Sequence, residues 1–85
     1  MNATMNLEDI TVFFTDDLKK KEGKEITFKS LDPDYKYCAV IEIRGKEVFD
    51  VDGASKESLG NRLLTMLEGE NDYKVFVETY YRGPD

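Results

Sequence analysis

The sequence contains no histidine, no tryptophan, one cysteine and two prolines in 85 residues. Without histidine it cannot form a catalytic triad that needs an imidazole, and a lone Cys38 allows neither an internal disulfide nor a zinc site of the Cys/His kind. The longest apolar run, Cys38–Ile41, is far too short to span a membrane. We therefore expect a soluble, cytoplasmic protein that is not an enzyme and that uses no cofactor or metal.

Positive charge is also scarce, since 18 Asp and Glu face 12 Lys and Arg, for a net charge of −6. Sequence-independent affinity for phosphate needs a positive surface, so we expect a basic protein partner rather than direct binding to nucleic acid or a membrane. The length suits a single domain, which we expect at residues 6–82, after a flexible leader at 1–5 and before a tail at 83–85.

The first segment has helical spacing. Its apolar residues recur at steps of three, four and four: Leu7, Ile10, Phe14 and Leu18. This spacing predicts an α-helix over residues 6–22, which Gly23 would end. However, the run Ile10–Phe14 is rich in β-branched and aromatic residues and fits a strand equally well.

The middle of the chain predicts three strands. Residues 24–29 alternate polar and apolar, and residues 31–34 form a turn around Pro33. Residues 35–43 form the longest strand, and residues 47–51 return antiparallel to it. The short loop between them pairs Ile41 with Phe49 and Ala39 with Val51.

The last third predicts a helix and a strand. Ser55 caps a helix that runs to about Glu68, with its buried stripe at Leu59, Leu63, Met66 and Leu67. Gly60 costs this helix about 1 kcal/mol, which a close approach to the sheet would explain. Residues 73–81 form the final strand, with two faces: Val75, Val77 and Thr79 on one, and Lys74, Phe76, Glu78 and Tyr80 on the other.

These elements predict an α+β fold, a two-layer sandwich in the order α-β-β-β-α-β. A four-stranded, mainly antiparallel sheet carries both helices on one face. The opposite face is left partly exposed, with nothing in the chain to cover Cys38, Val40, Val48, Phe76 and Tyr80. This open face can bind a partner or a second copy in a homodimer, unless sheet twist absorbs it.

The acidic residues gather at turns and strand ends. Asp50 and Asp52 with Glu57 can ligate Mg²⁺ or Ca²⁺, but no EF-hand pattern follows, and a solvated acidic rim is the default. Alternate strand residues lie roughly 6.6 Å apart, which suits a row of charges like that of a nucleic-acid backbone. The predicted partner-binding residues are six acids and two aromatic anchors: Asp32, Asp34, Asp50, Asp52, Glu70 and Asp72, with Tyr35 and Tyr80. Solubility alone also explains a charge of this size.

Two segments resemble known interaction domains. Gly45–Phe49 followed by Ser55–Asn61 resembles the third strand and second-helix start of the double-stranded RNA-binding domain, although only Lys56 matches that family's phosphate-gripping lysines. The strand-strand-strand-helix-strand order from residue 24 resembles the antitoxins of the HicB kind, without their proline- and glycine-containing third strand. These resemblances imply a divergent RNA-binding module, or a small oligomeric or antitoxin-like domain.

In size, acidity and element order the whole chain resembles the small phage anti-CRISPR proteins that block Cas9. Met5–Ile10 and Val40–Arg44 carry this likeness, together with the short turn into a returning strand and helix. The resemblance implies a non-enzymatic, nucleic-acid-mimicking inhibitor, encoded by a phage or mobile element. It would act in the bacterial host cytoplasm on a basic DNA- or RNA-binding groove of a defence or nucleic-acid-processing protein.

Overall fold

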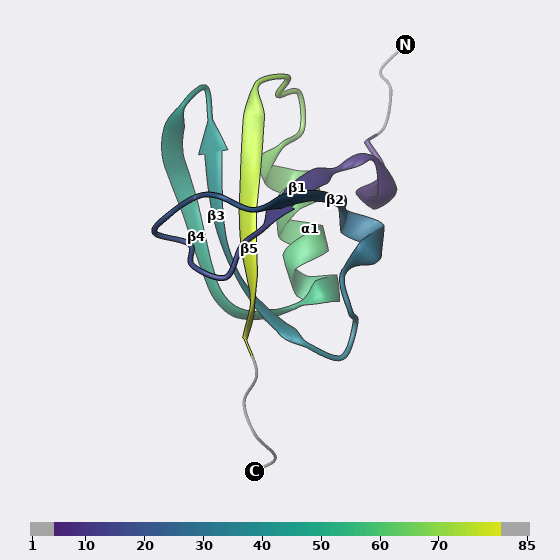
Figure 1. Ribbon diagram of the computed structural model, residues 1–85. Coiled ribbons are helices and arrows are strands. Elements are labelled where there is room, and N and C mark those ends of the chain that lie inside the picture. The colour runs from purple at the N-terminus through teal and green to yellow at the C-terminus, as the bar shows by residue number, and fades with distance from the viewer. Residues whose placement is uncertain (1–4, 81–85) are drawn as a thin grey trace.

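The computed structural model describes residues 5–80, with the backbone alone at Tyr80. The elements are η1 (Leu7–Asp9), β1 (Thr11–Phe14), β2 (Lys24–Thr27), η2 (Phe28–Ser30), β3 (Lys36–Ile43), β4 (Lys46–Ser55), α1 (Lys56–Met66) and β5 (Tyr73–Tyr80). The strands form one sheet in the order β2-β1-β5-β3-β4, with α1 behind it in the view of Figure 1. The predicted α+β class is confirmed.

The predicted four strands, two helices and antiparallel order need correction. The sheet has five strands and is mixed, because β1 runs parallel to β5 while the other neighbours are antiparallel. One α-helix lies within residues 5–80. The predicted leader and tail fall outside these residues, except Met5, which packs against the core.

The helix predicted over residues 6–22 is wrong, and the strand alternative for its centre is correct. Ile10 and Val12 are fully buried in the core, and Phe13 on the other face stacks on Phe76 with ring centroids 5.4 Å apart. Both faces of β1 are thus apolar, which satisfies helical spacing as readily as strand alternation. Pairing with β2 and β5 on either side favours the strand.

Gly23 has a different role from the predicted helix end. A Cβ atom at this position would lie 2.1 Å from the carbonyl oxygen of Phe14, so only glycine fits where β2 begins beside the end of β1. The connection between these strands, residues 15–23, therefore closes tightly at its base.

The predicted pairing of the central hairpin is confirmed. Ile41 pairs with Phe49, and Ala39 pairs with Val51. The returning strand is longer than the predicted residues 47–51, because β4 continues to Ser55 through a register shift, with Gly53 at a φ of 71°. A β-bulge accommodates these residues without ending the strand.

The predicted helix cap is confirmed, and so is the buried stripe except at Met66, which is half-buried, while Leu67 lies just after the end of α1. The Ser55 hydroxyl accepts a hydrogen bond from the Ser58 N–H at 3.2 Å, and Leu59, Leu63 and Leu67 are fully buried. Gly60 does allow a close approach, but not to the sheet. A Cβ atom there would meet Leu7 at 2.8 Å and Phe28 at 3.1 Å, so the glycine makes room for η1 and η2 against the helix.

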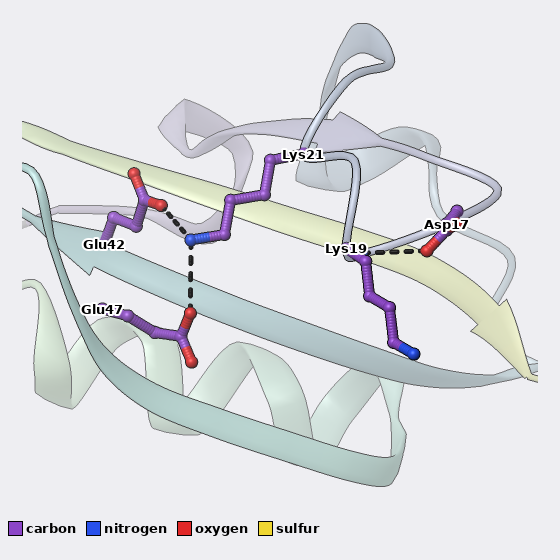
Figure 2. Close-up of polar contacts among 5 residues, drawn as sticks. All are labelled: Asp17, Lys19, Lys21, Glu42 and Glu47. Atoms are coloured by element: carbon purple, nitrogen blue, oxygen red, sulfur yellow. Dashed lines mark hydrogen bonds and ion pairs between the residues drawn. The ribbon is translucent and has the colours of Figure 1, made fainter.

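The sheet face opposite α1 is covered more than the sequence predicts. Val40 and Phe76 are buried, with 7% and 6% of their surface exposed, whereas Val48 is 45% exposed and Cys38 is intermediate. The connection at residues 15–23 runs across this face, on the side of the sheet away from the helix (Figures 1 and 2). The expectation that nothing in the chain covers Val40 and Phe76 is therefore wrong.

Candidate interaction surface

The predicted partner-binding residues do not converge on one surface. Asp32, Asp34 and Tyr35 precede β3, and Glu70 and Asp72 precede β5. Because β3 and β5 are antiparallel, with Lys36 opposite Tyr80, these two groups lie at opposite ends of the sheet. The strand β5 separates them by seven residue steps, which is about 23 Å. The Tyr80 side chain lies outside what the structure describes.

The group before β5 is engaged within the fold. Arg44 Nη1 lies 3.2 Å from Glu70 Oε2, and the Arg44 backbone N–H donates to the Asp72 carbonyl at 2.8 Å. Arg44 itself has a φ of 52° in the β3–β4 turn. These contacts tie that turn to the start of β5 and offset the Glu70 charge, which leaves Glu70 less available to a basic partner.

The group before β3 shapes its own turn. Asp32 Oδ1 accepts a hydrogen bond from the Asp34 N–H at 2.8 Å, and the Asp32 carbonyl accepts one from the Tyr37 hydroxyl. Burial raises the pKa of Tyr37, and the Asp32 charge raises it further. The carboxylates remain exposed at the surface, and Tyr35 beside them is 39% exposed.

Asp50 and Asp52 lie on the face opposite α1, on the outer strand β4. Asp50 pairs with Val40, and the Cys38 thiol donates to Asp52 Oδ1 at 3.0 Å. Cys38 in turn pairs with Glu78 of β5. We call Asp50, Asp52 and Glu78 the acidic face. Among residues 5–80, no Lys or Arg forms an ion pair with these three carboxylates.

The surroundings of the Cys38 thiol raise its pKa. Burial raises its pKa most, followed by the hydrogen bond to Asp52, and the charges of Asp52 and Glu78 add to the shift. A thiol that stays protonated in a negative field is a poor nucleophile. Sequence reasoning did not select Glu78, because its place beside Cys38 follows from the β3–β5 register, which no local pattern specifies.

Lys21 holds the crossing connection on this same face. Its Nζ atom lies 2.5 Å from Glu42 Oε2 and 3.2 Å from Glu47 Oε2, as Figure 2 shows. Hydrogen bonding to Glu42 and then to Glu47 raises the pKa of Lys21. The helix predicted over residues 6–22 would instead place this lysine in its last turn. In the structure it pairs with two acids beside the acidic face and offsets one of their two charges.

Within residues 5–80, no three Asp, Glu or Cys side chains are grouped as metal ligands, so Asp50, Asp52 and Glu57 do not form a site. No helix in that part of the chain is long and apolar enough to cross a membrane. Comparisons with protein-family models, curated proteins and solved structures return no match to this chain.

Proposed function

We propose that this chain is a non-enzymatic protein-binding inhibitor that presents the acidic face to a basic nucleic-acid-binding groove of another protein. The observation that carries the proposal is the set of carboxylates without an ion-pair partner at Asp50 and Asp52 of β4 and Glu78 of β5. Asp50 and Asp52 are exposed, and Glu78 is half-buried across Cys38 from Asp52.

The spacing of these charges supports the proposal. Asp50 and Asp52 are alternate residues on β4, a separation of roughly 6.6 Å along an extended strand. Glu78 adds a charge two strands away, because β3 lies between β4 and β5. Arginine and lysine side chains that line a nucleic-acid groove can pair with such an array. With a net charge of −6, the chain would be steered toward that groove.

The rigidity of the support also favours binding. β3 lies between β4 and β5 and pairs with each along its length, so the strands that carry the three carboxylates are held at a fixed spacing by hydrogen bonding to the same central strand. A preorganised array loses little conformational entropy on association. By contrast, the carboxylate of Glu70 already pairs with Arg44, which is why we leave it out of the proposed interface.

The partner class follows from the same chemistry. A basic groove of a host defence or nucleic-acid-processing protein matches the acidic face, and this includes the Cas9 surface implied by the anti-CRISPR resemblance. A phage or mobile-element origin and a bacterial cytoplasmic location stay predictions, as does a homodimer through the open face. The order helix, three strands, helix, which carries the resemblance to the double-stranded RNA-binding domain, is not the observed order within residues 5–80.

Affinity capture from bacterial lysate tests the proposal. The bait is the full chain, compared with the double variant Asp50→Lys and Asp52→Lys. The control is the double variant Asp9→Lys and Glu68→Lys, which makes the same charge change at exposed positions in η1 and after α1. We expect nucleic-acid-binding proteins to be retained by the wild type and the control, but not by the Asp50 and Asp52 variant. Equal retention by all three baits would contradict the proposal.

A further inference from the structure

The strand β2 forms one edge of the sheet, and β4 forms the other. β2 pairs with β1 through four consecutive residue pairs without a register shift, from Thr11 opposite Thr27 to Phe14 opposite Lys24. Within residues 5–80, no strand lies on its other side. A regular strand with a free edge is able to accept an added strand.

The outward-facing donors of β2 can be identified. The Phe28 N–H donates to the Ile10 carbonyl at 2.9 Å, directly after the last β1–β2 pair. Donors alternate in direction along an antiparallel strand, so the N–H groups of Lys24 and Ile26 face β1. Those of Glu25 and Thr27 then face the free edge, where a bound segment can reach both.

The opposite edge, β4, is less suited to strand addition. Its pairing with β3 shifts register between Tyr37 and Ala39 and again between Ile41 and Glu42. Gly53 adds a left-handed residue within the strand. Bulges and exposed charges are the usual protection of edge strands against pairing with another chain. Such irregularities are absent from the four β1–β2 pairs.

A pocket adjoins β2 on the face of the sheet that carries the core. Its volume is about 480 Å³, within the range of ligand sites. Ile26, which projects beside the pocket, is half-buried. Other residues that line it include Phe14, Leu31, Asp32, Tyr35 and Tyr37. An apolar side chain from an added strand would pack against a mainly apolar and aromatic surface in this pocket.

The charges around this edge favour a basic segment. Glu25 pairs with Phe13 and therefore projects from the face opposite the pocket. Asp32 lines the pocket, and Asp34 follows it in the same exposed turn. Lys24 is the one cation among the lining residues, at the far end of β2 from Thr27. Two copies of a chain with a net charge of −6 would repel each other, so a basic partner fits better than a second copy.

We propose that the free edge of β2 and the adjoining pocket bind an extended segment of the partner in which apolar and basic residues alternate. One apolar side chain enters the pocket between Ile26 and Tyr37, and the next residue, a lysine or arginine, lies beside Glu25. The basic character of the segment rests on the proposed function. The location of the binding site is independent of the proposed function, because β2 lies at the opposite edge of the sheet from Asp50 and Asp52.

The probe is a short synthetic peptide in which lysine alternates with valine around a central leucine. It is titrated into the full-length, ¹⁵N-labelled chain. We expect shifts at the amides of Glu25 and Thr27 and around the pocket. Thr27 has a φ of −86°, close to the range of proline, so Thr27→Pro removes an outward donor at modest cost to the fold. This variant should weaken binding by about tenfold, while Thr27→Ala, which keeps the N–H, should not.

The controls separate this inference from the proposed function. A peptide with a central proline, or with glutamate in place of lysine, should not bind. Circular dichroism of Thr27→Pro confirms that the variant is folded. The β2 site would be wrong if the peptide bound Thr27→Pro as tightly as the wild type, or if shifts appeared only around Asp50 and Asp52. Neither result would contradict the proposed function of the acidic face. Sedimentation that showed self-association through β2 would also overturn the inference.

Discussion

The ammonium group of Lys21 lies 2.5 Å from the carboxylate of Glu42, which joins the β1–β2 connection to the middle of the sheet. The Glu42 side chain is only 17% exposed, and Glu47 lies on the other side of the same ammonium group at 3.2 Å. Without Lys21, two carboxylates would face each other beside a partly buried surface. This contact therefore stabilises the connection over a face that would otherwise expose Val40 and Phe76.

Replacing Lys21 should loosen the connection without unfolding the sheet. In Lys21→Gln, the amides of Lys20 and residue 21, which donate to Asp17 and Leu18, should exchange with solvent faster. The Thr15 amide, which donates to Val77 at 2.7 Å, should change much less. Hydrogen exchange followed by NMR measures this difference. Lys19→Gln, at an exposed position in the same connection, is the matched control, and an equal effect from it would contradict the assigned role of Lys21.

Stability should fall as pH rises into the alkaline range. The pKa values of Cys38, Tyr37 and Lys21 are all raised in the fold, from ordinary values of 9.0, 10.0 and 10.5. The folded chain then holds more protons than the unfolded chain above these values, so the free energy of unfolding decreases with pH. The three contributions are fully present below pH 9.0, and Cys38 is the first to be lost.

Urea denaturation across this range, with Cys38→Ser as the comparison, measures the pH effect. The variant should lose less stability than the wild type as pH rises from about 9, because serine does not ionise there. Parallel pH profiles for the two proteins would show that the thiol does not contribute.

Gly23→Ala should destabilise the fold by about 1–3 kcal/mol, the usual cost of overpacking. The added Cβ atom would lie 2.1 Å from the Phe14 carbonyl oxygen, and neither backbone can move without disturbing the β1–β2 pairing. Gly45→Ala is the comparison, since a Cβ atom there has open space and the cost comes only from its φ of 79°. Thermal or urea denaturation should rank Gly23→Ala as the more damaging substitution. The reverse order would contradict the close approach.

Ser55→Ala should cost about 1 kcal/mol through loss of the helix cap. The Ser55 hydroxyl accepts from the Ser58 N–H, and no other residue in the described chain takes this hydrogen bond. Ser58→Ala keeps the Ser55 hydroxyl and the Ser58 N–H, so it serves as the control. Equal losses from the two variants in urea denaturation would argue against a capping role.

Local patterns predict the parts of the fold in which one face is buried. The β3–β4 register follows from alternating residues such as Ile41 and Phe49, and the start of α1 follows from Ser55. The first strand is different, because Val12 is buried on one face of β1 and Phe13 is half-buried on the other, which leaves its apolar spacing ambiguous. Tertiary pairing with β5 decides in favour of the strand, and no pattern within residues 6–22 contains that information.

The same limit applies to the interaction surface. Asp50 and Asp52 could be placed on one face from their spacing alone, but Glu78 joins them only through the pairing of β3 with β5. Arg44 offsets Glu70 across 26 residues of sequence, and Lys21 reaches Glu42 across 21. Long-range contacts of this kind select which charges remain unpaired, so composition gives the total charge and the fold gives its distribution.

The most direct test of the proposed function is competition with DNA for the basic groove of a captured partner. Fluorescently labelled duplex DNA is bound to that partner, and the chain is titrated in at two salt concentrations, about 50 mM and about 200 mM. We predict that the wild type displaces the DNA at low salt and does so less effectively at high salt. The variant with Asp50→Lys and Asp52→Lys should fail to displace it. Displacement by that variant at the wild-type concentration, or displacement unaffected by salt, would contradict the account.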